Sequence, residues 1–405
     1  MFNYTPTWNR RLRISEKKIP CTLCNSRDTE VFFSLPPVPT QDGVMYHSKN
    51  AALNAPKGSI KLNFCKSCGF IVNVGYEEEK VNFDDYDFSN DHSPMFMEFV
   101  EGLCQRLIKK YSLRDSLILD IGCGDGAFLK KICKLGNNRG IGIDPGFDHQ
   151  KNATKLHNVT FLRQYYSEEH ADLSPDLIVC RLVIDLLDNQ TDFLNLIRRN
   201  LDNSPDTIVY IEVPYANYTF EERVIWNVVY EHKAWYTPES FVYQFEKCGF
   251  EVLSVAPCWN NEFLGIEVKP RMTPQFPSYP SSEKIEKLSQ TISDFEKDFR
   301  KQMDESQLEI EEIKRDCLTV AAWGAGARAV SFFNLFDLLE EVPFIVDINV
   351  KRHGKFLPGS GQEIVAPEFL LEYQPDLIIV TNPTYANEII SHARSLGLES
   401  EFWVL

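Results

Sequence analysis

A short apolar run that leads into a glycine-rich turn and then into a helix constrains this fold more than any other feature, and the pattern occurs twice. The first instance is Leu117–Gly126, LILDIGCGDG, and the second is Leu318–Gly326, LTVAAWGAG. Glycines at such a turn let the backbone come close to a ligand. Apolar runs and helical patterns alternate around both turns, which predicts an α/β fold with two parallel sheets.

The remaining pattern divides the 405 residues into three parts. Strands are expected at 117–119, 140–143, 177–180, 207–211, 318–323, 343–347 and 376–380, and helices at 95–111, 128–134 and 282–315. In the last helix apolar residues recur at steps of three and four, so it is amphipathic and is expected to connect one domain to the next. We therefore expect a small N-terminal module, a central Rossmann-like domain and a second, C-terminal Rossmann-like domain, at residues 1–75, 76–275 and 276–405.

Four of the eleven cysteines form two close pairs near the N-terminus, Cys21/Cys24 and Cys65/Cys68. Each Cys-x-x-Cys pair can occupy two corners of a tetrahedron, so the two pairs together predict a closed, structural zinc site. Inert or redox-active pairs are the alternative, but a redox pair normally opens a helix after a strand, whereas here an Asn or a Gly follows each pair and indicates a knuckle. The other seven cysteines are single and lie in segments with strand or helix patterns.

The charge balance limits the possible partners. Asp and Glu number 58 and Lys and Arg 42, which gives a net charge of −16 and disfavours binding to nucleic acid. No run of about 18 apolar residues is present, and the N-terminus lacks the pattern of a secretory signal, so we expect a cytoplasmic protein without a membrane partner.

Two carboxylates accompany the first glycine turn. Asp120 precedes the turn, where an acid repels a pyrophosphate but can pair with the ammonium of an amino-acid-like cofactor. Asp144 ends the next strand, where a carboxylate can accept hydrogen bonds from both hydroxyls of a ribose. This order of residues resembles the first motif of the class I S-adenosylmethionine-dependent methyltransferases. The resemblance implies a cofactor site formed by Asp120, Gly122, Gly124, Gly126, Asp144, Gln164 and Tyr165.

A wider pattern resembles the three-domain sugar C-methyltransferases, which methylate nucleotide-linked ketodeoxysugars. The shared features are the N-terminal cysteine pairs, Glu212-Val213-Pro214, Tyr230-Glu231-His232, a Thr-Pro-Glu-Ser-Phe segment at 237–241 and the second Rossmann-like domain. The resemblance implies S-adenosylmethionine and structural zinc as cofactors and a nucleotide-sugar as substrate. It also implies substrate contacts at Tyr86, Glu212, Tyr236, Gly324, Gly326, Arg328 and Lys355.

Methylation of a carbon requires a base that removes a proton next to a ketone. We expect His232 to be this base, because neutral imidazole predominates at physiological pH, and we expect Glu231 to assist it. Related enzymes commonly read Tyr-His-Glu-His at this point, whereas this chain places Val229 where the family has its catalytic tyrosine. Tyr230 or Tyr236 is the expected replacement.

An anionic nucleotide-sugar must be captured against the net negative charge, so a local basic pocket is expected, with Arg328, Lys351, Arg352 and Lys355 as its candidates. The C-terminal glycine turn, with Asp347 closing the next strand, also fits NAD in form, and a purely structural domain is a further alternative. An oxygen or non-sugar acceptor and a non-catalytic interaction module are the alternative functions. Intact Asp120 and Asp144 argue against the interaction module, and the sequence does not define an oligomeric state.

Overall fold

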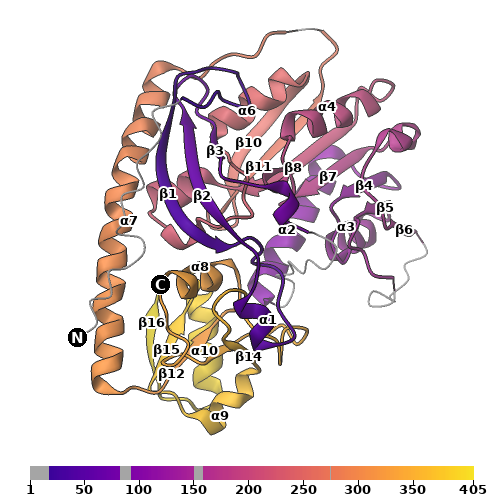
Figure 1. Ribbon diagram of the computed structural model, residues 1–405. Helices are drawn as coiled ribbons and strands as arrows, with labels where there is room; N and C mark the ends of the chain where they lie inside the picture. Colours follow the sequence, from indigo (N-terminus) through magenta and orange to yellow (C-terminus); the bar gives the residue numbers. More distant parts are fainter. Residues whose placement is uncertain (1–17, 83–92, 150–157, 274) are drawn as a thin grey trace.

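The computed structural model describes residues 18–82, 93–149, 158–273 and 275–405, and it contains three β-sheets, each in a separate part of the chain's fold (Figure 1). The α/β fold class is confirmed: a four-cysteine module comes first, a Rossmann-like sheet is central, and a parallel sheet forms the C-terminal part. No helix of the described residues is long and apolar enough to cross a membrane.

The N-terminal sheet is antiparallel and has the order β1-β2-β3-β9. Its elements are β1 (Thr29–Pro39), α1 (Lys49–Leu53), β2 (Lys57–Cys65), β3 (Ile71–Asn73) and β9 (Ala234–Trp235). The end of β1 is Pro-rich, and its register shifts between Leu35 and Val38. The fourth strand, β9, comes from the central part of the chain, so the N-terminal module is completed by residues directly after His232.

The central sheet has seven strands in the order β10-β11-β8-β7-β4-β5-β6. Its strands are β4 (Leu117–Ile121), β5 (Arg139–Ile143), β6 (Val159–Leu162), β7 (Leu177–Arg181), β8 (Ile208–Pro214), β10 (Phe250–Cys258) and β11 (Phe263–Pro270). The associated helices are α2 (Pro94–Tyr111), α3 (Ala127–Gly136), α4 (Gln190–Asn200), α5 (Ala216–Glu221) and α6 (Pro238–Lys247). The expectation of a wholly parallel sheet is wrong here, because β10 and β11 form an antiparallel hairpin against β8.

The C-terminal sheet is parallel and has the order β14-β13-β12-β15-β16. Its elements are β12 (Val320–Trp323), α8 (Ala327–Leu335), β13 (Phe344–Val346), β14 (Glu363–Val365), α9 (Leu370–Tyr373), β15 (Leu377–Val380), α10 (Ala386–Ser395) and β16 (Glu401–Val404). Short 3-10 helices are η2 (Glu78–Lys80), η3 (Glu168–Leu173), η4 (Ile184–Leu186), η5 (Ile225–Asn227), η6 (Pro367–Phe369) and η7 (Pro383–Tyr385). In chain order the strands follow the pattern 3-2-1-4-5, as in the doubly wound dinucleotide-binding fold without its sixth strand.

Helix α7 (Ser282–Asp316) is the long amphipathic helix expected from the apolar spacing. It runs along the N-terminal sheet and down to the C-terminal part (Figure 1). The apolar side chains that it buries include Leu288, Ile292, Phe295, Phe299 and Met303. They belong to one hydrophobic core that also contains Phe33 of β1 and Ile345 of β13, so α7 joins the N-terminal and C-terminal parts through a shared core.

Candidate active site

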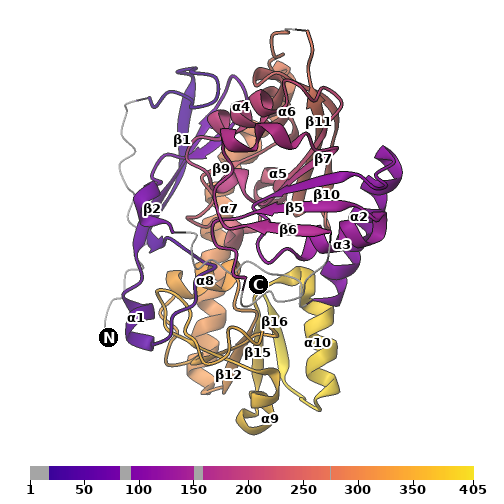
Figure 2. The same cartoon turned by 90° about the vertical axis from the view of Figure 1, so that its right-hand side faces the viewer.

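The carboxyl ends of parallel strands from the central and C-terminal sheets meet at a cavity of about 240 Å³. From the central sheet it is lined by Asp185, after β7, and Pro214, at the end of β8. From the C-terminal sheet it is lined by Gly324, Asp347 and Asn382, which follow β12, β13 and β15. Ligands of open α/β sheets bind at the carboxyl ends of the strands, so this cavity is a candidate ligand site. In Figure 2 the C-terminal sheet lies below the central one.

The backbone of the first glycine turn leaves room for a ligand to approach closely. Gly122, Gly124 and Gly126 all have positive φ, at 73°, 54° and 79°, which glycine adopts without strain. A Cβ added to Gly122 would lie 2.3 Å from Val183, and one added to Gly126 would lie 2.3 Å from Phe161, whereas Gly124 faces open space. The turn therefore packs at both ends on the protein and leaves its middle free for a cofactor.

The two carboxylates beside this turn fit S-adenosylmethionine. Asp144 accepts hydrogen bonds from the amides of Gly124 (2.9 Å) and Gly146 (2.7 Å), which holds its carboxylate at the end of β5. Asp120 is buried, and burial raises its pKa to about 7. Burial disfavours the charged form of the carboxyl group and so raises its pKa. A cation beside it, such as the ammonium of the cofactor's methionine part, would lower the pKa again.

Gln164 and Tyr165, which are expected at the cofactor site, lie on the loop after β6. The Gln164 side chain contacts the His170 ring, with 2.6 Å between Gln164 Nε2 and His170 Nε2. Tyr165 is 68% exposed. Both roles stay predictions, and the exposure of Tyr165 leaves its ring available to a planar base.

His232 lines the cavity, on the short connection between η5 and β9. Its ring makes an edge contact with Trp235, with 5.8 Å between the centroids. Burial lowers the pKa of His232 to about 4, so the imidazole is neutral at physiological pH and can accept a proton. The amide of Asn73 on β3 donates to the carbonyl of Lys233 (2.8 Å), so the N-terminal sheet fixes this segment.

The two residues before His232 point toward the N-terminal module. Glu231 is buried and accepts hydrogen bonds from the amides of Asp42 and Gly43, the latter at 3.3 Å. Tyr230 is buried, stacks on Tyr76, and its hydroxyl accepts from the amide of Glu77 at 2.7 Å. Neither residue is among those that line the cavity, so their predicted catalytic roles stay predictions. The contacts of both side chains have a structural function, because they connect this segment to the N-terminal module.

Three of the predicted substrate residues, Gly324, Gly326 and Arg328, line the cavity. Glu212 and Tyr236 are fully buried. Glu212 accepts two hydrogen bonds from Arg181, at 3.0 and 2.8 Å, and one from Tyr210 at 2.8 Å. Lys355 is half-buried and is not among the described lining residues, and Tyr86 lies outside the described residues.

The described residues do not form the expected basic pocket. Arg328 and Arg352 line the cavity, but Arg328 pairs with Glu262 at 3.2 Å and Arg352 with Asp347 at 3.2 Å. Lys351 and Lys355 do not line it in the described part of the chain. The sequence alone could not reveal the ion pair between Arg328 and Glu262, because Glu262 lies in the loop between β10 and β11, far along the chain from Arg328.

Sequence reasoning missed several residues that line the cavity: Asp42, Asp185, Trp259, Asn382 and Tyr385. Asp185 and Asn382 follow strands that were expected, and the rule that ligands bind at carboxyl ends of strands could have identified them. Trp259 lies in the β10–β11 turn, and the sequence analysis did not predict that hairpin. Asp42 could not be placed without knowing that Glu231 binds its loop.

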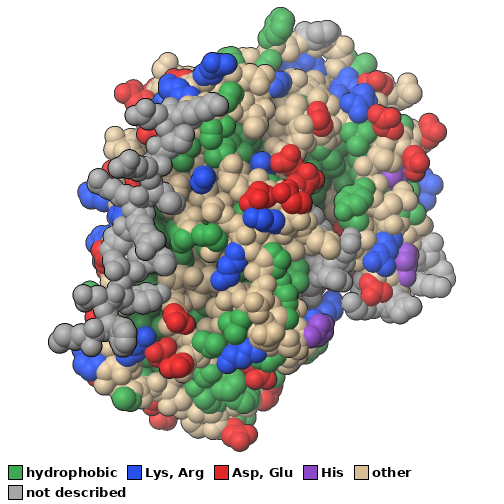
Figure 3. Space-filling view, in the orientation of Figure 1, with side chains coloured by type: hydrophobic (Ala, Val, Ile, Leu, Met, Phe, Trp, Pro, Cys, Tyr) green, Lys and Arg blue, Asp and Glu red, His purple; other side chains and the backbone are tan. Residues whose placement is uncertain are grey.

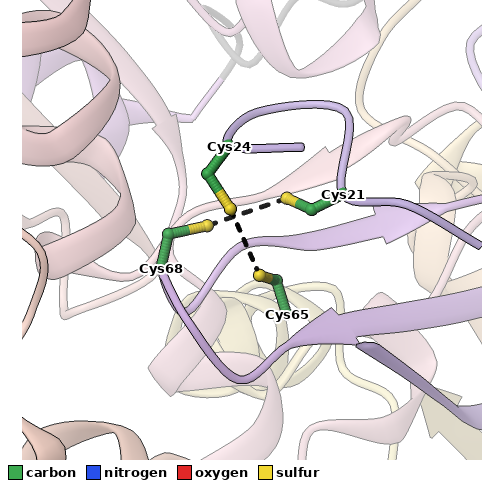
Figure 4. Close-up of side chains that lie close together, drawn as sticks. All are labelled: Cys21, Cys24, Cys65 and Cys68. Carbon is green, nitrogen blue, oxygen red and sulfur yellow. Dashed lines mark hydrogen bonds between the residues drawn. The ribbon is translucent and has the colours of Figure 1, made fainter. Parts of the chain in front are cut away.

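The four N-terminal cysteines form one cluster, whose sulfur atoms all lie within 4.8 Å of one another (Figure 4). The sulfur atoms of Cys21 and Cys68 are 3.7 Å apart, and those of Cys24 and Cys65 are 3.5 Å apart. A tetrahedral zinc ion with bonds of about 2.3 Å to sulfur separates its ligands by about 3.8 Å. The donor set and its spacing therefore fit a tetrahedral metal with no open position.

Turn chemistry explains why these knuckles form. The residues after each pair, Asn25 and Gly69, have φ of 60° and 75°, a conformation that Asn and Gly tolerate best. Their amides donate to the carbonyls of Cys21 and Cys65, both at 2.9 Å. Each turn thus brings the two sulfurs of its pair to the same side.

Comparison with known families agrees with this architecture. Residues 96–255 match a family described as a methyltransferase domain, and residues 270–404 match one described as a C-methyltransferase C-terminal domain. With the glycine turn, its two carboxylates and the strand order, these matches define the class: the chain is an S-adenosylmethionine-dependent methyltransferase. More closely, it is a C-methyltransferase of the kind that carries this C-terminal domain and a four-cysteine cluster, and it is homologous to NovU.

The C-methyltransferase NovU of Streptomyces niveus is 23% identical over 345 residues, which cover 82% of this chain and 81% of NovU. A ribosomal protein L11 methyltransferase of Pseudoalteromonas atlantica is 33% identical over 85 residues, 20% of this chain and 29% of that protein. Among solved structures, a SAM-dependent methyltransferase from Aquifex aeolicus has 19% identity and a TM-score of 0.36, and it covers 45% of this chain and 98% of its own.

Proposed function

We propose that this C-methyltransferase acts on a carbon next to a ketone in a nucleotide-linked deoxyketosugar, and that the cavity between the two sheets holds the acceptor. The observation that carries the proposal is the position of His232, which faces a cavity lined by both the methyltransferase sheet and the C-terminal glycine turn. A base and two ligand-binding sheet edges therefore meet at one place.

Asp120, Gly122, Gly124, Gly126 and Asp144 would hold S-adenosylmethionine, with Gln164 and Tyr165 toward its adenine. When bound, this cofactor supplies an electrophilic methyl group. Val183 supports the proposal, because it packs against Gly122 two residues before Asp185, a lining residue of the acceptor cavity. The loop after β7 is therefore shared by the cofactor turn and the acceptor site.

His232 would remove the proton from the carbon next to the ketone, and the electron pair left behind would form the new carbon–carbon bond. Burial keeps its imidazole neutral, which is the form that accepts a proton. Aromatic lining from Trp259 and Tyr385 suits the apolar face of a deoxysugar and excludes water from the anionic intermediate.

The C-terminal part would bind the nucleotide. Gly324 and Gly326 precede α8, and the amides at the start of a helix attract phosphate. Arg328 lies in the first turn of α8, where its pairing with Glu262 positions the guanidinium. Contacts from Glu212, Tyr236, Lys355 and Tyr86 stay predictions, and zinc in the four-cysteine cluster would stabilise the N-terminal module.

A panel of nucleotide-linked ketosugars with methyl-labelled S-adenosylmethionine tests this function by mass spectrometry. We expect transfer of one label to carbon and deuterium exchange at the carbon next to the ketone. His232→Gln should lose both, whereas His47→Gln, at an exposed position, should keep them. Label on oxygen, or no transfer to any member of the panel, would contradict the proposal.

A further inference from the structure

Asp185 is a buried carboxylate without a hydrogen-bond partner among the described residues. Its side chain lies in η4, is 1% exposed, and has no partner at either Oδ1 or Oδ2. Burying an ionised carboxylate without partners costs free energy, so a buried carboxylate of this kind calls for a structural or functional explanation. Asp185 lines the acceptor cavity, as His232 does.

Among the described residues, the imidazole of His232 is the cation-forming group that comes within ion-pair distance of this carboxylate. His232 Nε2 and Asp185 Oδ2 are 3.9 Å apart, and His232 Nδ1 also lacks a partner. The Lys233 amide donates to the Asp185 carbonyl at 2.8 Å, which ties the two segments together. Shortening the separation between His232 Nε2 and Asp185 Oδ2 by about 1 Å would bring the two side chains within hydrogen-bond distance.

Neighbouring carboxylates are directed elsewhere. Glu231 binds the amides of Asp42 and Gly43, and Asp188 pairs with the Lys233 ammonium at 3.0 Å. Of these three acids, Asp185 is the one that faces the imidazole.

We infer that Asp185 is the positioning residue of His232: it accepts a hydrogen bond from one ring nitrogen and so directs the other nitrogen at the acceptor carbon. The inference rests on the proposed function, in which His232 is the base. The acceptor C–H bond breaks, its proton goes to His232, and its electron pair passes into the enolate and then into the new bond to the methyl group. S-adenosylhomocysteine leaves, and the proton passes from His232 to solvent.

Electrostatics gives Asp185 a second effect on the base. Burial alone makes His232 a weak base, with a pKa of about 4, and a carboxylate beside the imidazolium opposes that shift. Burial also raises the pKa of Asp185 to about 7, so the carboxylate form gains population as pH rises through neutrality. The charge that forms on His232 during proton removal is thereby compensated within the cavity.

Two other titratable groups around the pair are neutral in this range, a thiol and a phenol. Cys180 on β7 and Tyr236 after β9 both have pKa values raised well above their usual ranges by burial. Asp42, which also lines the cavity, has a pKa raised to about 6, again by burial, and its amide donates a hydrogen bond to Glu231. A transition near pH 7 that disappears in Asp185→Asn therefore belongs to Asp185, whereas one near pH 6 belongs to the Asp42–Glu231 pair.

The test compares Asp185→Asn and Asp185→Glu with Asp188→Asn as a matched control, using deuterium exchange at the acceptor carbon and steady-state kinetics. Asp185→Asn should lower kcat by about 10²-fold or more, with the acceptor KM changed less than about threefold, because the general base loses its orientation. Its kcat should also lose the rise through about pH 7. Asp185→Glu should recover part of the rate, and Asp188→Asn should match the wild type.

A spectroscopic readout on the intact wild-type protein makes the test independent of how the variants fold. With ¹⁵N-labelled histidine, and with His232→Gln used to assign the signal, one His232 ring nitrogen should carry a fixed, hydrogen-bonded proton. A ring that averages between tautomers would overturn the inference, as would full exchange in Asp185→Asn. Full exchange in His232→Gln would instead overturn the proposed base, so the two failures are distinguishable.

Discussion

At the residue scale, burial sets the chemistry of the cofactor site. Asp120 is 3% exposed, and burial raises its pKa to about 7, with Arg181 opposing the shift and Asp144 adding to it. The sequence could place Asp120 before the glycine turn, because the strand and turn are local patterns. It could not give the pKa, which depends on the neighbours that folding supplies.

This pKa predicts how cofactor binding depends on pH. The carboxylate of Asp120 attracts an ammonium only when ionised, so the affinity for S-adenosylhomocysteine should rise with pH and level off above about pH 7. Below that value each pH unit should weaken binding by up to about tenfold. Calorimetry between pH 5.5 and 8.5 measures this, where Asp120→Asn should bind weakly and lose the transition. An unchanged slope in that variant would assign it to Asp144, whose pKa burial also raises.

Two glycines of the first turn are expected to have different roles, Gly126 in packing and Gly124 in cofactor binding. At Gly126 an added methyl group would lie 2.3 Å from the Phe161 ring, so Gly126→Ala should destabilise the fold by about 1–3 kcal/mol. At Gly124 the added group meets open space, so Gly124→Ala should cost about 1 kcal/mol, from positive φ alone, but weaken S-adenosylhomocysteine binding. Thermal unfolding and calorimetry distinguish them. Gly102→Ala, inside α2 with open space around the added group, is the control, and it should stabilise the fold by about 0.5–1 kcal/mol and leave binding unchanged. Equal affinity of Gly124→Ala and the wild type would contradict a cofactor at this turn.

At the element scale, long periodic segments were predictable and tertiary pairings were not. Helix α7 matches the expected range closely, because its apolar spacing extends over many turns. The two-residue strand β9 has no periodic signal of its own and exists because β3 pairs with it. The β10–β11 hairpin turns through Trp259, Asn260 and Asn261, which all have positive φ, a conformation that the sequence does not reveal for tryptophan.

Phe295 is the residue through which α7 should contribute most to stability. Its ring is fully buried and contacts Phe33 of β1 at 5.3 Å and Phe220 of α5 at 4.9 Å, so it joins the N-terminal sheet to the central part. Phe295→Ala should therefore lower the free energy of unfolding by about 3–5 kcal/mol. Leu308→Ala on the same helix, at a 63% exposed position, should change it by less than about 0.5 kcal/mol. Denaturant unfolding measures both, and equal effects would contradict the assigned role of α7.

At the scale of the whole molecule, charges compensate one another locally. On the described part of the face in Figure 3, Lys and Arg side chains lie in small groups among acidic and apolar ones, without a continuous basic tract. The cavity follows the same rule, with each of its arginines paired to a carboxylate. The net charge predicted that an anionic substrate needs local positive charge to bind. It could not predict the carboxylates that pair with these arginines, because the pairing depends on the fold.

The four-cysteine cluster is connected to the catalytic histidine candidate through consecutive elements. Cys65 ends β2 and Cys68 precedes β3, which pairs with β9 directly after His232. The carbonyl of Leu23, in the first knuckle, accepts a hydrogen bond from Lys247 at the end of α6. A metal that holds the two knuckles together should therefore stabilise both the module and the position of His232.

Metal removal should accordingly affect catalysis more than cofactor binding. We expect about one zinc per chain, and we expect Cys68→Ser to lose the metal, lower Tm by roughly 5–10 °C and reduce methyl transfer. Binding of S-adenosylhomocysteine should change little, because Asp120, Gly124 and Asp144 lie on β4, β5 and their turns, which do not contain the cluster. Cys317→Ser, at an exposed cysteine, is the matched control and should behave as the wild type. Metal analysis, thermal unfolding and calorimetry measure these effects, and a Cys68→Ser protein with unchanged Tm and activity would show that the cluster does not support the site.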